Sequence, residues 1–393
     1  MKPALAPASS FAAHWGLDPE VAYLNHGSYG ACPRVVLDRQ AALRTELERE
    51  PVDFLTRQLP ARLAEARRAI APFVGADPDD LAFVANATSG VNAVLRSLPI
   101  QPGDELLTTD HVYGACGKAL RYAAARAGAE VRVAAVPFPL EHEDQAVLPV
   151  LAAVTPRTRL ALLDHVTSVT GLVFPLPRLV QELHARGVPS LVDGAHALGI
   201  LPLDLNAIGA DYYTANAHKW LCAPKGAAIL HVRRERQAGL HPLVISHGYA
   251  PAGAFRDEFD WTGTADPTAW LCIPECIRFL GTLLPGGWPE LMARNRALAL
   301  EAREMLSSVV GAPPPCPPSW LGALASLPLP SGAPGSPAAR LDADGLSAWF
   351  RERGIETWLH PWANGRVIRV SAQLYNSREQ FAALAQMLRE ALA

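Results

Sequence analysis

The stretch of sequence that decides the fold is DYYTANAHKWLCAPKGAAIL, residues 211–230. It contains one apolar run at 211–218 and the start of another at 226–233, separated by a turn that holds Lys219. Similar strand-like runs alternate with helical patterns further upstream. They lie at 81–86, 105–110, 131–136, 159–166 and 189–196. Strands that alternate with crossover helices predict a mostly parallel sheet with helices on both faces, in which a ligand lies beyond the carboxyl ends of the strands.

The pattern changes after about residue 265. A Pro/Gly-rich segment at 311–339 is typical of an irregular surface connection. A strand-like run at 365–373 and an amphipathic helical pattern at 378–392 follow it. We therefore expect three parts, namely an N-terminal segment (1–22), a large α/β domain (23–265) and a small C-terminal α+β domain (266–393).

The composition excludes several classes of protein. Of the 393 residues, 50% are hydrophobic and 19% are charged, a composition that is typical of a globular chain. The net charge is −3, so the chain has no excess of basic residues that would favour binding to nucleic acid or anionic membranes. No uncharged stretch resembles a membrane span, and the N-terminus lacks the apolar region of a signal peptide. The six cysteines form no C-x-x-C pair, which argues against a disulfide framework or a zinc site. We expect a cytoplasmic protein without metal, nucleic-acid or membrane partners.

Only four of the 35 basic residues are lysines, so chemistry that requires an amine has few candidates. Lys219 follows a predicted strand in apolar surroundings, where desolvation would lower its pKa as imine chemistry requires. Asp193 ends the strand-like run before it. Taken singly, Lys219 could be a surface lysine and Asp193 a turn former. Together they favour a pyridoxal phosphate site, in which the lysine holds the cofactor as a Schiff base and the carboxylate pairs with the pyridinium nitrogen.

A third segment, NATSGVNAVL, supplies Thr88, Ser89 and Gly90 where a predicted strand ends and a helix begins. Hydroxyls and free backbone N–H groups at a helix N-terminus suit a phosphate. The same residues also suit an ordinary helix cap. The order of cup, aspartate and lysine, each after a strand, favours the phosphate interpretation.

These segments carry a resemblance to a known family. VDGAHALG, ANAHKWLCAPKG, NATSGVN, FDWTGTADPTAW and VIRVSAQLYN together resemble the fold-type I pyridoxal phosphate enzymes of the class V aminotransferase and cysteine desulfurase superfamily. LNHGSYGACP, TTDHVYGACGKAL and LLDHVTSVTGL are most similar to its isopenicillin N epimerase-like branch. The resemblance runs from about residue 23 to residue 376. It implies the α/β, pyridoxal phosphate-dependent transferase-like fold, with a smaller C-terminal α+β domain.

The resemblance also implies roles for the cofactor-binding residues. Lys219 would hold pyridoxal 5′-phosphate and Asp193 would pair with its ring nitrogen. His196, and also Thr167 or Ser168, would lie near the phenolic oxygen or the imine. The ring-stacking residue would come from DHVYG, where Tyr113 is favoured over His111. The phosphate would be anchored by Thr88, Ser89, Gly90, Asn216 and His218.

The remaining roles concern the substrate and a second subunit. Arg369 would hold the carboxylate of an amino acid substrate, because a fork of N–H donors suits that planar anion. Asn25 and His26 would line the entrance. Thr264 would reach the phosphate of a neighbouring subunit, which implies a homodimer with shared active sites. The alternatives are that the histidines are structural and that Arg369 forms a surface ion pair.

Two departures from the family pattern bear on the reaction. Ser168-Val169-Thr170-Gly171 replaces the usual S-P-T-G, which puts the substrate in doubt. The loop HPWANGRVIR, which ends at Arg369, lacks the nucleophilic cysteine that sulfur abstraction requires, which argues against a cysteine desulfurase. The leading hypothesis is an isopenicillin N epimerase-like amino acid epimerase. A class V aminotransferase or a C–S or β-elimination lyase is the first alternative, and a non-catalytic binding protein with this fold is the second.

Overall fold

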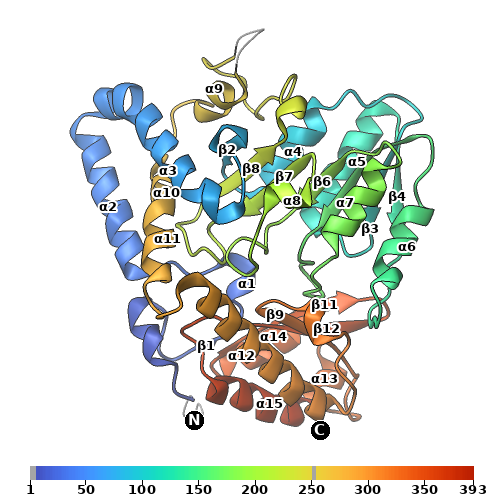
Figure 1. Cartoon of the computed structure of the whole chain (residues 1–393). Helices are drawn as coiled ribbons and strands as arrows, with labels where there is room; N and C mark the ends of the chain where they lie inside the picture. Colours follow the sequence, from blue (N-terminus) through green and yellow to red (C-terminus); the bar gives the residue numbers. More distant parts are fainter. Residues whose placement is uncertain (1–5, 250–253) are drawn as a thin grey trace.

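The computed structural model describes residues 6–249 and 254–393. Its centre is a seven-stranded sheet of strand order β2-β8-β7-β6-β5-β3-β4 (Figure 1). The strands are β2 (Leu81–Val84), β3 (Glu105–Thr109), β4 (Glu130–Ala134), β5 (Thr158–Asp164), β6 (Ser190–Asp193), β7 (Tyr212–Asn216) and β8 (Ala228–Val232). Only β8 runs antiparallel to its neighbours. The predicted mostly parallel sheet is confirmed.

Both faces of the sheet are covered because successive residues of each strand point to opposite sides. In β5, Leu160 and Leu162 belong to the core under α4 (Ala87–Ser97) and α5 (Gly114–Ala127). Ala161 and Leu163 belong to the opposite core, with α3 (Leu59–Val74), α6 (Asp144–Ala152) and α7 (Leu176–His184). The central strands are therefore largely apolar, whereas the edge strand β4 (EVRVA) is only partly buried and carries Arg132 in its middle.

The smaller domain, orange and red in Figure 1, has an antiparallel sheet of order β11-β12-β9. Its strands are β9 (Leu324–Leu329), β11 (Trp358–Trp362) and β12 (Gly365–Ser371), and its longest helices are α12 (Gly287–Val310), α14 (Ala343–Glu352) and α15 (Arg378–Leu392). The prediction that 311–339 is an irregular surface connection was wrong. Its run LASLPL forms β9 and buries five of six residues, because the two prolines at its end interrupt only the edge of the sheet.

The N-terminal segment lies against the small domain. The backbone N–H of Ser9 donates to the carbonyl of Tyr375 at 3.1 Å, and the Trp15 ring lies 5.2 Å from the Tyr375 ring. A short strand, β1 (Ala22–Tyr23), pairs with β10 (Ile355–Glu356). The boundary at residue 265 stays a prediction. The second helix after it, α11 (Ile273–Gly281), contacts both α3 and α12.

Three further features concern ligands and environment. No helix in the described part of the chain is long and apolar enough to cross a membrane. The six cysteines are all free thiols. Within residues 6–249 and 254–393, no group of three or more His, Cys, Asp or Glu side chains is arranged to hold a metal ion.

Candidate active site

The carboxyl ends of β5, β6 and β7 and the start of α4 surround a cavity of about 510 Å³, which we call the Lys219 cavity. The cavity brings together residues that are far apart in the sequence because parallel strands end at one edge of the sheet. Nine of the sequence-predicted site residues line it. They are Thr88, Ser89, Tyr113, Ser168, Asp193, His196, Asn216, His218 and Lys219.

Lys219 lies in the turn after β7, and its side chain is buried. Its Nζ lies 3.1 Å from Nε2 of His196. Burial, followed by the positive charge of Arg369, lowers the pKa of Lys219 from 10.5 to about 8. The indole N–H of Trp220 donates to Nδ1 of His196 at 3.3 Å, which places the imidazole proton on Nε2. A neutral histidine that donates to Nζ requires an uncharged amine, which is the reactive form of a lysine.

Two carboxyl groups form the floor of the cavity. Asp164 and Asp193 are register partners at the ends of β5 and β6. Asp193 accepts a hydrogen bond from the backbone N–H of Ala195 at 2.9 Å and one from the Cys116 thiol at 3.1 Å. Burial and the charge of Asp193 raise the pKa of Asp164 well above its usual value. Asp164 is therefore the member of the pair whose protonated form this site favours.

The wall opposite the carboxyl groups is the first turn of α4. The Asn86 side chain caps this helix by accepting from the Ser89 N–H at 2.8 Å. The amide oxygen of Asn216 accepts from the Ala87 N–H, also at 2.8 Å. The hydroxyls of Thr88 and Ser89 lie at the cavity wall, beside the positive end of the helix dipole. This arrangement suits a bound phosphate.

Two other phosphate-site candidates have structural contacts. Gly90 allows α4 to lie close to the sheet, because a Cβ there would come within 2.4 Å of the Thr214 hydroxyl. His218 lies in the cavity wall, with its Nδ1 2.9 Å from the carbonyl oxygen of Ala227. Its pKa is lowered to about 4 by burial, so the imidazole is neutral and its other nitrogen is free to serve a ligand.

Arg369 lies directly behind the cavity wall. It donates to the carbonyl of Ser168 at 2.6 Å, to the Ser28 hydroxyl at 2.9 Å and to the Asn25 side chain at 3.2 Å. Its guanidinium is buried, and among the described residues no carboxylate forms an ion pair with it. Burial lowers its pKa to about 9. A buried cation without a counter-ion is costly, so the site suits an anionic ligand.

Asn25 and His26, which were expected to line the entrance, are buried instead. His26 donates from Nε2 to the carbonyl of Lys219 at 2.9 Å and accepts at Nδ1 from the Tyr375 hydroxyl at 2.8 Å. Burial lowers the pKa of His26 to about 3, so it stays neutral. The histidine therefore fixes the backbone of the lysine turn rather than facing a ligand.

Of the predicted residues that remain, His111, Thr167 and Thr264 lie outside the Lys219 cavity, whereas Tyr113 lines it. His111 is buried, donates to the carbonyl of Val136 at 2.9 Å and accepts from the Thr170 hydroxyl at 2.7 Å. Thr167 is buried in the same network, 2.7 Å from that hydroxyl. Tyr113 is 41% exposed and lines the cavity, as the preference for it over His111 expected. Thr264 is exposed, in the loop between α9 (Phe255–Asp260) and α10 (Thr268–Leu271).

The sequence reasoning missed several residues of the site. Asp164 ends an apolar run in LLDHV, the same signal that identified Asp193, and could have been found. Cys116 and Ser28 contact the site through long-range packing, so no local pattern indicates them. Ala195 lies between Asp193 and His196 and donates its backbone N–H to Asp193.

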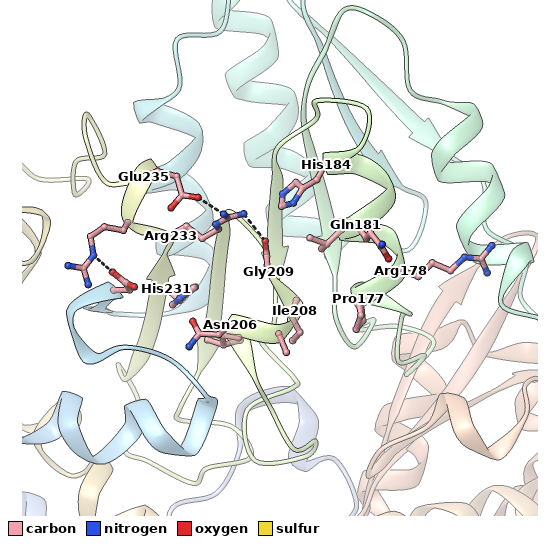
Figure 2. Close-up of a pocket in the computed structure, with 15 residues that line it drawn as sticks. Pro177, Arg178, Gln181, His184, Asn206, Ile208, Gly209, His231, Arg233 and Glu235 are labelled. Carbon is pink, nitrogen blue, oxygen red and sulfur yellow. Dashed lines mark hydrogen bonds and ion pairs between the residues drawn. The ribbon is translucent and has the colours of Figure 1, made fainter.

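Another cavity, of about 740 Å³, lies at the opposite edge of the sheet (Figure 2). Figure 2 shows Arg233 in contact with Glu235 and with the Gly209 carbonyl, which precedes β7. His184 bonds Asp211 at 2.7 Å. These charged groups are paired within the protein, whereas the Lys219 cavity holds a buried lysine whose pKa is lowered, with the buried arginine Arg369 behind its wall. The chemistry is therefore assigned to the Lys219 cavity.

The donor set fits pyridoxal phosphate. The α4 N-terminus suits the phosphate, Lys219 is a buried amine with a pKa lowered to about 8, and Asp193 is a buried carboxyl group on the same floor. Asp164 Oδ2 is buried and has no hydrogen-bond partner among residues 6–249 and 254–393, so it is available to a group in the cavity. The fold of the chain is similar to that of the cystine C-S lyase C-DES in its solved complex with cysteine persulfide. The TM-score is 0.79 at 23% identity, covering 95% of this chain and 98% of that one.

The fold and the family define a fold-type I, pyridoxal phosphate-dependent enzyme. The chain belongs to the Aminotransferase class-V family, whose sequence profile matches residues 31–384. It is 38% identical to isopenicillin N epimerase of Streptomyces clavuligerus, over 95% of both chains. It is 39% identical to the enzyme of that name from Amycolatopsis lactamdurans, over 95% of this chain and 96% of that one. It is 29% identical to L-cysteine desulfhydrase of Arabidopsis thaliana, over 82% and 73% of the respective chains.

Proposed function

We propose that this enzyme epimerises an amino acid at Cα, with Lys219 as the residue that binds the cofactor covalently. The observation that supports this most is the buried Nζ of Lys219, with its pKa lowered to about 8, which lies 3.1 Å from His196 and in one cavity with Asp193. The two isopenicillin N epimerases, at 38% and 39% identity over nearly the whole chain, favour epimerisation. Membership in a family of enzymes disfavours a non-catalytic binding protein.

Pyridoxal phosphate, when bound, supplies an electron sink that accepts the charge left on Cα when its proton is removed. The Thr88 and Ser89 hydroxyls and the α4 N-terminus hold the phosphate, and Asp193 keeps the ring nitrogen protonated. Arg369 attracts the substrate carboxylate toward the wall formed by Ser28 and Ser168.

Proton transfer at Cα is assigned to Lys219. Once the incoming amine has displaced it, its neutral Nζ takes the Cα proton as a general base. His196 donates from Nε2 to the single lone pair of this amine at 3.1 Å, so that hydrogen bond breaks before Nζ takes the proton. Epimerisation returns a proton to the other face of Cα. Two phenols, Tyr29 and Tyr113, line the cavity and are the side chains we propose for that step, with water as the alternative.

The test is Cα proton exchange in heavy water over a panel of L- and D-amino acids, followed by chiral analysis. We expect exchange with inversion, and Lys219→Ala should abolish it. Borohydride reduction should fix the cofactor on Lys219. Exchange without inversion, together with release of a keto acid, would contradict the epimerase proposal.

A β-eliminating lyase is the second candidate, because L-cysteine desulfhydrase is among the relatives. The β11–β12 hairpin, residues 358–371, carries no cysteine, which disfavours sulfur transfer to the protein. Release of pyruvate and sulfide from L-cysteine without inversion would favour the lyase.

We further propose a cytoplasmic homodimer with shared active sites. The support is Thr264, which is exposed in the α9–α10 loop and free to reach a partner's phosphate. Mixing inactive Lys219→Ala with inactive Thr264→Val subunits should restore part of the activity, because a mixed dimer contains one intact site. A protein that sediments as a monomer while fully active would contradict the proposal.

A further inference from the structure

A second cavity, which we call the side-chain cavity, adjoins the Lys219 cavity and has a volume of about 990 Å³. Tyr113 and Ser168 line both cavities. The side-chain cavity lies between the start of α5 in the large domain and strand β11 in the small domain. A molecule whose Cα lies at Lys219 therefore has a direct path into it past Tyr113 and Ser168.

The walls of the side-chain cavity are aromatic and supported from behind. The Trp362 ring lies 4.6 Å from the ring of His111 and 6.2 Å from that of Phe138. His111 is fixed in turn by hydrogen bonds from both ring nitrogens, to Thr170 and Val136. The aromatic wall is therefore preorganised, and it does not need a ligand to hold its shape.

Arg369 connects the two cavities. Its guanidinium lies 4.0 Å from the centre of the Trp358 ring, which lines the side-chain cavity. Its Nη1 donates to the carbonyl of Ser168, the residue that both cavities share. A substrate carboxylate held here leaves Cα on the Lys219 side and the aromatic wall within reach of the substrate side chain.

We infer that the side-chain cavity binds the side chain of the substrate, and that this side chain is large, largely apolar and without net charge. The inference rests on the proposed reaction at Cα. The side-chain cavity is nearly twice as large as the Lys219 cavity, so the side chain of cysteine or alanine would leave it filled with water. Its rim carries one carboxylate, Asp110, and one ammonium group, Lys118, so it offers no net charge for a charged side chain to match.

The test compares two carboxylates that differ only in a phenyl group, 3-phenylpropanoate and propanoate, titrated calorimetrically into the holoenzyme. Neither contains an amine, so binding is measured apart from the reaction. We expect 3-phenylpropanoate to bind tenfold tighter or more, since a matched apolar pocket gives on the order of 10- to 200-fold discrimination per group. The same preference should appear as a higher kcat/KM of Cα exchange for L-phenylalanine than for L-alanine.

Two variants change the side-chain cavity in opposite ways. Trp362→Ala removes part of the aromatic wall, and Gly114→Phe fills the space, because a Cβ at Gly114 meets no atom within 4 Å. Each should reduce the phenylpropanoate-to-propanoate ratio by about tenfold. Gly16→Phe is the matched control, because Gly16 is exposed, lines neither cavity and has only Arg34 near its Cβ, at 3.8 Å. It should leave the ratio unchanged.

The inference is overturned if propanoate binds as tightly as 3-phenylpropanoate, or if Gly114→Phe leaves the ratio unchanged. If Trp362→Ala does not fold, Gly114→Phe still tests the inference. Failure of the proposed function looks different. In that case no amino acid exchanges its Cα proton, while the two carboxylates still report on the cavity.

Discussion

Lys219 is expected to react with pyridoxal phosphate as an amine that titrates near pH 8. Burial and the charge of Arg369 lower its pKa from 10.5 to about 8. A base is uncharged above its pKa, so about half of the Lys219 amine is neutral at pH 8, against about 0.3% for a lysine of pKa 10.5. The difference is a factor of about 150, or about 3 kcal/mol. The reactive form should therefore increase steeply between pH 7 and pH 9 and level off above.

For the assay, the cofactor is first removed from the protein. Pyridoxal phosphate is then added by rapid mixing at a series of pH values between 6 and 11. The rate at which the visible absorbance of the lysine conjugate appears is plotted against pH, and the midpoint of that curve is the quantity of interest. Borohydride trapping and peptide mapping then locate the conjugate, and Lys219→Ala should give none. Arg369→Met should move the midpoint upward, because the Arg369 charge is the second cause of the lowered pKa. The midpoint should stay below 10.5, because burial is the larger cause. A wild-type midpoint above pH 10, or a conjugate on another lysine, would refute the reasoning.

Three further substitutions test the floor and the backbone of the site. Asp193→Asn should keep the pyridoxal phosphate conjugate on Lys219 but reduce the rate of Cα proton exchange by about 10²-fold or more, because the ring nitrogen of the cofactor loses its carboxylate partner. An unchanged exchange rate would argue against that pairing. The raised pKa of Asp164 means that its contribution to stability is present at low pH and is lost as the pH rises. Asp164→Asn should therefore stabilise the cofactor-free protein against urea more at pH 8 than at pH 5, and equal effects would contradict the assignment. Gly30→Ala should destabilise the protein by about 2 kcal/mol or more, because Gly30 has a φ of +71° and a Cβ there would lie 2.3 Å from a backbone oxygen in the lysine turn. Gly103→Ala is the control: Gly103 has a φ of +83° but no atom near its Cβ position, so the substitution should destabilise the protein by only about 1 kcal/mol.

The sequence predicts the large domain and the centre of the site because both depend on local patterns. Each apolar run becomes a strand of the sheet, and Asp193 and Lys219 follow strands that end at one edge. The start of α4 meets them there because β2 precedes it in the same sheet. These residues share one cavity as a consequence of parallel topology, which is readable without coordinates.

The residues behind the cavity wall could not be read from the sequence. Whether His26 faces a ligand or the lysine turn depends on Tyr375, which lies in the C-terminal part of the chain. His111 and Tyr113 are two residues apart in DHVYG, and only packing against the small domain determines that His111 supports a wall while Tyr113 faces the cavity. The prediction that the Pro-rich segment is an irregular connection was wrong for a related reason. Its strand β9 is stabilised by pairing with β12 and not by the intrinsic strand propensity of its residues.

The unpaired groups of the site explain why its ligands and its stability are coupled. Nε of Arg369 and Oδ2 of Asp164 are buried and lack hydrogen-bond partners in the described ranges of the chain. Each such unpaired group destabilises the folded protein by about 1–3 kcal/mol. Apolar residues at these positions would avoid that destabilisation if the role of the groups were purely structural. The anionic carboxylate of a substrate and the polar edge of a cofactor would offset these costs. Because ligands that bind only the folded state raise its stability, the cofactor should stabilise this protein by more than its contacts on the cavity wall alone would suggest.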